Sequence, residues 1–253
     1  NSEAVNLALD ALTEPGDVIV TEPLVYPGLR TAATQLGRRV VAVPTDEHGM
    51  RPDALEQACR DHAPKLLYLN PTLQNPTATT MPQQRREAIA RVAQRCGVRL
   101  VEDDPYWLLA EAPPPPIAAL PSWAPDQVVY ISTLSKCLSP GLRVAFVRIA
   151  DAPLRERFLV ALRSFALMVA PLTAALATQW IFDGSATPLM EGIRQEARLR
   201  HRMARDVLAG RYNGAGDGLH VWLELPSYWN PSQLARAADS AGIAVTPAEA
   251  FAA

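Results

Sequence analysis

Short apolar runs without polar alternation recur between residues 17 and 149, and stretches with helical periodicity separate them. A strand that is buried on both faces of a sheet reads as such a continuous apolar run, and strands separated by helices usually pair in parallel. We therefore expect an α/β fold whose mostly parallel sheet is covered by helices on both faces. The expected strands are 17–21, 39–43, 65–69, 98–101, 128–131 and 144–149, and the helices between them are 27–36, 52–60 and 82–97.

The pattern changes after Asp151. Two apolar helical segments, at 154–169 and 172–182, precede a long charged helix at 188–209, whose basic residues we interpret as a solvated face. Residues 219–225 alternate apolar and polar side chains, which is typical of a half-buried antiparallel strand. A helix at 231–241 and a short strand at 243–246 follow. We expect a large domain over residues 1–186, then a connecting helix and part of a smaller α+β domain over 187–253.

Composition and charge exclude several classes of protein. The sequence carries 24 Lys and Arg against 26 Asp and Glu, so it lacks the basic excess of a nucleic-acid-binding domain. Its cysteines (Cys59, Cys96 and Cys137) are far apart and form no CxxC pair, which disfavours a disulfide framework or a zinc ribbon and favours a reducing, cytoplasmic compartment. The histidines show no ligand spacing, so we expect no metal site.

The uncharged stretch 164–180 approaches the length of a membrane span. It contains Pro171, Thr178 and Gln179 and is rich in alanine, which makes it weak for insertion. We expect a buried helix pair or a subunit interface here, and no membrane partner. The chain begins without a methionine and ends after 245–247 without a closing element, so we expect a piece of a longer protein; its polar, acidic start does not read as a signal peptide.

The motif at residues 132–137, Ser-Thr-Leu-Ser-Lys-Cys, directly follows an expected strand. A lysine at the carboxyl end of a parallel strand points into the crevice where α/β sheets bind ligands. The hydroxyls of Thr133 and Ser135 suit phosphate oxygens, and Arg143 follows. Together these groups suggest an aldehyde cofactor that carries a phosphate, with Lys136 forming a Schiff base and the arginine binding the phosphate. Taken singly, Lys136 is better interpreted as a solvated surface lysine, and Arg143 could equally be a surface or helix-capping charge.

Three further motifs follow expected strands. In residues 102–106, Glu-Asp-Asp-Pro-Tyr, the acids place carboxylates at the same crevice, where one could hold a pyridine nitrogen protonated. A helix N-cap or a magnesium site is the alternative, and the second is disfavoured because no glycine-rich phosphate loop is present. Residues 70–78 contain two Asn-Pro-Thr units, which could be a plain turn. Tyr26, in residues 22–28, could stack on a planar cofactor or pack in a turn.

In this order and spacing, the four motifs resemble the fold-type I pyridoxal-phosphate (PLP) enzymes, specifically the class I/II aminotransferases. The resemblance runs over essentially the whole chain and implies a PLP-dependent transferase-like large domain. It implies that Lys136 forms the Schiff base with the cofactor and that Asp103 pairs with the pyridine nitrogen. Asn75 and Tyr106 would then hydrogen-bond the cofactor's phenolate oxygen. Residues expected to contact the ring or the phosphate are Tyr26, Thr133, Ser135, Arg143, Asn1 and Ser2.

The wording of several motifs is similar to the MocR-type regulators, which are GntR-family transcription factors. In those proteins an aminotransferase-like domain follows a winged-helix DNA-binding domain. The motifs concerned are 72–77, 102–106, 135–143 and 245–251. Ala78 replaces the glycine that ordinary aminotransferases carry after Asn-Pro-Thr, which also favours the regulators. The family's arginine for the substrate carboxylate would lie beyond residue 253.

Two functions follow from the resemblance. In the first, the chain is an effector-sensing domain that forms an aldimine with an amino acid or amine, and DNA is contacted only through a winged-helix domain outside this chain. In the second, it is a free-standing aminotransferase that transfers an amino group from an amino acid to a 2-oxo acid. Both use the same cofactor residues. The resemblance also implies a homodimer, with residues 164–182 as the candidate interface.

Overall fold

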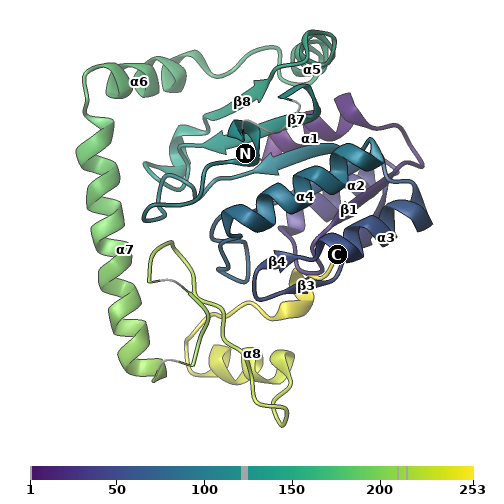
Figure 1. Cartoon of the computed structure of the whole chain (residues 1–253). Helices are drawn as coiled ribbons and strands as arrows, with labels where there is room; N and C mark the ends of the chain where they lie inside the picture. Colours follow the sequence, from purple (N-terminus) through teal and green to yellow (C-terminus); the bar gives the residue numbers. More distant parts are fainter. Residues whose placement is uncertain (1, 121–124, 210, 215) are drawn as a thin grey trace.

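A six-stranded sheet forms the centre of the computed structural model, which describes residues 2–120, 125–209, 211–214 and 216–253 (Figure 1). The strand order is β2-β1-β5-β6-β7-β8; all neighbours pair in parallel except β8, which runs antiparallel to β7. This confirms the mostly parallel sheet expected from the apolar runs. The strands are β1 (Val18–Thr21), β2 (Arg39–Ala42), β5 (Leu66–Leu69), β6 (Arg99–Asp103), β7 (Val128–Thr133) and β8 (Ala145–Ile149).

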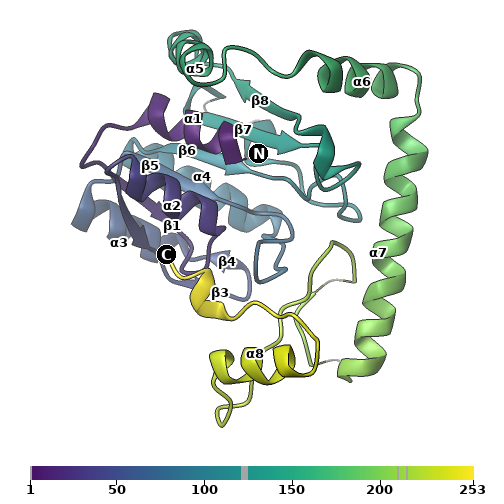
Figure 2. The ribbon, with the colours of Figure 1, turned by 180° about the vertical axis from the view of Figure 1, so that it is seen from behind.

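Helices cover both faces of this sheet, as Figures 1 and 2 show from opposite sides. One core includes α1 (Ser2–Leu12), α2 (Pro27–Gln35) and α5 (Ala152–Phe165), and the other includes α3 (Pro52–His62) and α4 (Gln83–Cys96). In β1, Ile19 belongs to the first core, whereas Val18 and Val20 belong to the second. Because successive side chains of a strand point to opposite faces, a strand covered on both sides needs an apolar residue at every position.

Local sequence sets the helix boundaries. The carboxylate of Asp151 caps α5 by accepting a hydrogen bond from the backbone N–H of Leu154 at 2.7 Å. Helix α3 starts at Pro52. Proline lacks an N–H, and the N–H groups of a helix's first turn have no partner within the helix, so no hydrogen bond is lost there. Helix α4 ends at Gly97, which has a φ of 66° and therefore adopts the left-handed conformation that glycine tolerates best.

The chain then leaves the sheet through α6 (Pro171–Phe182) and the long helix α7 (Ala186–Leu208), which runs down one side of the molecule toward α8 (Pro231–Ser240) (Figure 1). These three helices confirm the helical expectations for this region. Among the described residues, no helix combines the length and apolar character that crossing a bilayer requires. Of the side chains in α6, only that of Ala177 is fully buried within the chain, so the expectation of a buried helix pair is wrong for α6.

The expected strands at 219–225 and 243–246 are not formed. Within the described part of the chain, Trp222 makes an isolated bridge to Asn213, and no continuous strand lies beside either segment. A strand leaves its backbone N–H and C=O groups unsatisfied without a neighbour, so alternation alone cannot form one. A small hairpin that the sequence did not indicate, β3 (Thr45–Asp46) with β4 (Gly49–Met50), precedes α3. Short 3-10 turns lie at Ile117–Ala119, Pro125–Gln127, Pro140–Leu142 and Ala248–Ala250.

Candidate cofactor site

The four motifs lie at one edge of the sheet, where its parallel strands end. Strand β1 leads to Tyr26, β5 leads to Asn70, β6 ends at Asp103, and β7 leads into the turn that carries Lys136. In open α/β sheets this edge is the place where ligands bind. The fold therefore brings together motifs that are more than a hundred residues apart in the sequence.

Lys136 is exposed on its turn, and its Nζ lies 6.0 Å from the centre of the Tyr106 ring. The next residue, Cys137, points inward: it is buried, and its Sγ lies 3.6 Å from the backbone oxygen of Thr133. Burial raises the pKa of the Cys137 thiol and keeps it neutral. The turn thus presents the lysine amine and uses the cysteine for packing.

Asp103 is almost completely buried and is held from two directions. Its Oδ2 accepts a hydrogen bond of 2.5 Å from the hydroxyl of Tyr68, and its backbone oxygen accepts one of 2.8 Å from Asn70 Nδ2. The side-chain oxygen of Asn70 also accepts from the backbone N–H of Asn75 at 2.8 Å. Burial, followed by the charge of Asp103, raises the pKa of Tyr68 well above its usual value, so Tyr68 remains a donor. Asn70 therefore joins the end of β6 to the loop that carries Asn75.

The three consecutive acids do not share one crevice, so this part of the sequence-based expectation is wrong. Glu102 and Asp104 are fully buried on the other side of β6, with the side chain of Arg86 between them. Arg86 Nη1 lies 3.7 Å from Glu102 Oε1 and 4.0 Å from Asp104 Oδ2. Alternation along the strand explains the separation, because residues on either side of Asp103 must point to the opposite face. Of the three acids, Asp103 is the one that accepts a hydrogen bond from Tyr68 in the described part of the chain.

Tyr106 lies beside Lys136. Unlike the exposed lysine, Tyr106 is buried. Burial raises its pKa to about 12, with smaller contributions from Asp103 and Tyr26, so its hydroxyl stays protonated at neutral pH. Its ring centre lies 5.4 Å from that of His220.

His220 lies beside Tyr106, a neighbour that the sequence did not indicate because a single histidine carries no spacing signal. Its Nε2 lies 3.1 Å from the backbone oxygen of Gln74 and must donate, since a carbonyl only accepts. Burial lowers the pKa of His220, and the positive charge of Lys136 contributes to the same shift. His220 is therefore a neutral neighbour of Tyr106 and Lys136.

The hydroxyls expected to bind phosphate lie together. Thr133 Oγ1 is 3.0 Å from Ser135 Oγ, and it donates to the backbone oxygen of Val144 at 2.8 Å. Arg143 is exposed, with a φ of 53°. Within the described part of the chain, its guanidinium forms no ion pair or hydrogen bond, and the structure does not join it to Thr133 or Ser135.

Tyr26 is positioned by its neighbours at the start of α2. A Cβ at Gly28 would lie 2.2 Å from Tyr26 Cε1, so a side chain at residue 28 would displace the tyrosine ring. The hydroxyl of Tyr26 lies 2.7 Å from Ser2 Oγ, which brings α1 to the same site. Asn1, the other residue expected here, lies outside the described residues.

The chemistry of these donors fits PLP. Lys136 would supply an amine for the aldehyde, and Asp103 would supply a buried carboxylate for the pyridine nitrogen. Tyr106 is a protonated phenol, and Arg143, whose guanidinium has no partner among the described residues, would bind the phosphate. Among the described residues, no group of three or more His, Cys, Asp or Glu side chains could hold a metal ion.

The chain is similar in sequence to a known protein family and to several of its relatives. The family model for aminotransferase class I and II matches residues 2–253. An uncharacterized HTH-type transcriptional regulator of Bacillus subtilis, YdeF, is 34% identical over 98% of this chain, and the match spans 53% of that relative. The 2-aminoadipate transaminase of Thermus thermophilus is 31% identical over 99% of this chain and 65% of its own length.

Solved structures show the same fold. The kynurenine aminotransferase of Pyrococcus horikoshii, crystallised with PMP, superposes with a TM-score of 0.90 and 26% identity over 99% of this chain and 65% of that one. The α-aminoadipate aminotransferase LysN of Thermus thermophilus, bound to a phosphopyridoxyl-leucine, superposes with a TM-score of 0.88 and 29% identity. The chain thus spans between half and two-thirds of these relatives. It belongs to the aminotransferase class I and II family, whose cofactor is pyridoxal phosphate.

Proposed function

We propose that this chain is the effector-sensing domain of a MocR-type transcriptional regulator, in which a PLP site binds an amino acid or amine. The observation that carries the proposal is the match to the HTH-type regulator YdeF, which is 34% identical over nearly all of this chain and has almost half its length outside the match. Two further HTH-type regulators, both from Escherichia coli, match at 30% and 31% identity.

The proposed roles of the site residues follow from their chemistry. Bound PLP supplies an aldehyde that condenses reversibly with amines and a ring that withdraws electrons from the amino acid. Lys136 would hold the aldehyde carbon until an effector amine arrives, and would afterwards accept the proton at the effector's Cα. Asp103 would hold the proton at the pyridine nitrogen. Arg143, with Thr133 and Ser135, would bind the phosphate.

Tyr106 and Asn75 would orient the ring by hydrogen bonds to its phenolate oxygen. Because burial raises the pKa of Tyr106 to about 12, this hydroxyl can donate throughout the physiological range. Tyr26 would stack on the ring face. Ser2, bonded to Tyr26, would lie at the phosphate end together with Asn1.

Lys136 is also the only side-chain amine available at this edge. The sequence contains two lysines, Lys65 and Lys136. Lys65 immediately precedes β5 and therefore lies at the opposite end of the parallel strands.

We also propose that the chain divides into a large domain and a smaller part at residue 186, and that it forms a homodimer. Residues 1–186 contain the whole six-stranded sheet, and 187–253 contain α8 and all of α7 except its first residue. The end of α5, the segment after it and α6 expose a series of large apolar side chains: Phe165, Leu167, Leu172 and Phe182 are each at least two-thirds exposed. Large apolar side chains exposed in this number favour a protein interface, and a second copy of the chain is the proposed occupant.

The test uses the intact protein that contains this chain. Its coding sequence upstream of residue 1 should encode a basic winged-helix module. The intact protein, loaded with PLP, should then change its affinity for its promoter DNA when an amino acid or amine is added, as measured by fluorescence anisotropy. The Lys136→Ala variant should bind the same DNA and fail to respond. A response of equal size in Lys136→Ala would contradict the proposal.

A free-standing aminotransferase is the second candidate. Similarity to the 2-aminoadipate transaminase favours this function, because that enzyme is 31% identical over 99% of this chain. The match spans 65% of the transaminase, against 53% of the regulator YdeF. Steady-state release of a 2-oxo acid from an amino acid, with no DNA-binding module upstream, would support this function. Absence of turnover together with amine-dependent DNA binding would support the sensor.

A further inference from the structure

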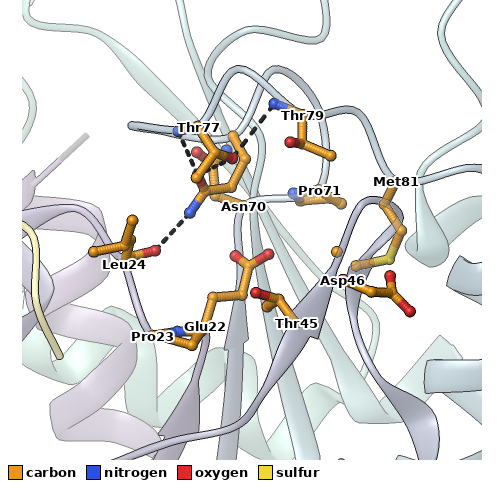
Figure 3. Close-up of a pocket in the computed structure, with 12 residues that line it drawn as sticks. Glu22, Pro23, Leu24, Thr45, Asp46, Asn70, Pro71, Thr77, Thr79 and Met81 are labelled. Carbon is orange, nitrogen blue, oxygen red and sulfur yellow. Dashed lines mark hydrogen bonds between the residues drawn. The ribbon is translucent and has the colours of Figure 1, made fainter. Parts of the chain in front are cut away.

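A small cavity lies beside the cofactor edge, between the end of β1, the β3–β4 hairpin and the loop after β5 (Figure 3). Its volume is about 160 Å³. The side chain of Glu22 points into it, is 4% exposed, and has an Oε2 without a hydrogen-bond partner. The polar part of the lining includes Thr45, Asp46, Thr77 and Thr79 together with the amides of Asn70 and Gln74.

As a carboxylate, Glu22 keeps one buried oxygen, Oε2, without a hydrogen-bond donor. Burial raises the pKa of Glu22 to about 8, against smaller opposite effects of the Asn70 N–H and the Gln74 amide. Buried polar groups are normally paired, so an orphaned carboxyl oxygen in a polar cavity indicates a missing ligand.

When Glu22 is ionised, the cavity carries one negative charge. Asp46, the other acid in the lining, is neutralised by Arg85, whose guanidinium donates to both of its oxygens at 2.9 Å. This pairing holds the pKa of Asp46 below its usual value. Glu22 has no such partner. The cavity therefore repels anions and leaves a single carboxylate uncompensated.

We infer that this cavity binds one small monovalent cation, of the K⁺ or NH₄⁺ type, with Glu22 as its charged ligand. One uncompensated carboxylate matches one positive charge, whereas Ca²⁺ and Mg²⁺ sites usually gather several carboxylates. The hydroxyls of Thr45 and Thr79, which make no hydrogen bond within the described chain, are available as neutral ligands. The volume equals about five water molecules at roughly 30 Å³ each, enough for a cation that keeps part of its hydration shell.

The experiment measures the thermal unfolding of the PLP-loaded chain at pH 9, where Glu22 is ionised. Chlorides of K⁺, NH₄⁺, Na⁺ and tetraethylammonium are compared at one ionic strength. At least one small cation should raise the melting temperature saturably, by about 3 °C or more, over the bulky tetraethylammonium ion. Equal melting temperatures in all four salts would overturn the inference.

Two variants assign the effect to the cavity. Glu22→Gln keeps the shape and removes the charge, so it should melt at the same temperature in all four salts. Glu47→Gln removes an exposed carboxylate on the β3–β4 turn and should retain the cation dependence of the wild type. Cation dependence that persists in Glu22→Gln would overturn the inference.

Crystals of the wild-type chain soaked in rubidium chloride give a test that needs no variant. An anomalous peak beside Glu22 is expected, and a cavity without one in well-ordered crystals would contradict the inference. The readouts are also independent of the proposed cofactor roles. Lys136→Ala should keep the cation dependence, so a failure of one proposal is distinguishable from a failure of the other.

Discussion

At Asp103 one carboxylate is held by a buried hydroxyl, while its backbone is held by a buried amide. The Tyr68 hydroxyl donates at 2.5 Å, and Asn70 donates to the backbone oxygen. None of these partners depends on the cofactor, so the chain itself orients Asp103 before any ligand binds. This is the preorganisation that a residue paired with a pyridine nitrogen requires.

Tyr68→Phe should therefore destabilise the chain without changing its fold. The variant removes a buried hydrogen bond to a carboxylate, and such bonds contribute about 1.5–3 kcal/mol. Urea unfolding of the cofactor-free chain should show a loss of that size. Tyr228→Phe, at a side chain that is 79% exposed, should change the unfolding free energy by less than about 0.5 kcal/mol. Equal effects of the two substitutions would refute the role given to Tyr68.

Glu22 predicts a pH dependence of stability whose sign is opposite to that of a salt-bridged acid. Its pKa is about 8 in the folded chain against an ordinary value of 4.5, so the folded state retains a proton that the unfolded state has released. The free energy of unfolding should then fall as pH rises from about 4.5 to about 8. Two neighbours do not titrate in this range: the pKa of Asp46 lies below 3.8, and that of Tyr68 lies well above 10.

Urea unfolding of wild type and Glu22→Gln at pH 5, 6.5 and 8, in tetraethylammonium chloride, checks this prediction. Glutamine cannot ionise. The unfolding free energy of the variant should therefore rise relative to that of wild type with each increase in pH. If the difference in unfolding free energy between wild type and Glu22→Gln stays constant with pH, the titration of Glu22 does not cause the pH dependence of stability.

At the scale of elements, Arg86 joins α4 to β6 and to the loop after β5. It is fully buried, and its guanidinium donates to the backbone oxygens of Met81 and Pro71 as well as lying near Glu102 and Asp104. The periodicity of α4 indicates its apolar stripe, including Ile89 and Val92, but not this residue. The burial of Arg86 depends on carboxylates that lie outside α4. The hydropathy pattern of a single helix cannot reveal such partners.

Arg86→Met should cost about 3–5 kcal/mol, because it leaves the buried carboxylates of Glu102 and Asp104 without a cation. Chemical denaturation should record this loss at pH 7. The matched control is Arg91→Met on the same helix, where the guanidinium is 59% exposed and lies 3.8 Å from Glu87. Its effect should stay below about 1 kcal/mol. A loss in Arg86→Met no larger than that of the control would contradict this account.

The sheet was predictable because each strand carries its own evidence: 66–69 is apolar at every position, and the structure buries every one of these side chains. Residues 219–225 also show a strand pattern, yet the structure forms only the bridge at Trp222. The difference is the neighbour. A buried strand is recognisable from composition, whereas pairing depends on residues elsewhere in the chain. The motif at 102–106 likewise indicated acids near the site. It did not indicate which acid would face Tyr68, because Tyr68 lies on another strand.

At the scale of the whole molecule, α6 stands away from the sheet (Figures 1 and 2). Several of its apolar side chains are exposed. Leu172 and Phe182 are 86% and 87% exposed. If a second copy covers this surface, Leu172→Glu and Phe182→Glu should each shift the chain from dimer toward monomer in sedimentation velocity, because an unpaired charge would be buried in the interface. Gln84→Glu, on the exposed side of α4, should leave the distribution unchanged. A monomeric wild type would remove the basis for the interface.

The central claim is that Lys136 attaches the cofactor, and the presence of only two lysines makes it directly testable. Wild type, Lys65→Ala and Lys136→Ala are loaded with PLP, reduced with borohydride, and digested for mass spectrometry. We predict phosphopyridoxyl label on the peptide containing Lys136 in wild type and in Lys65→Ala, and no lysine label in Lys136→Ala, which should also lack the visible absorbance of attached PLP. Label on Lys65 with Lys136 unmodified, or an unchanged spectrum in Lys136→Ala, would contradict the account.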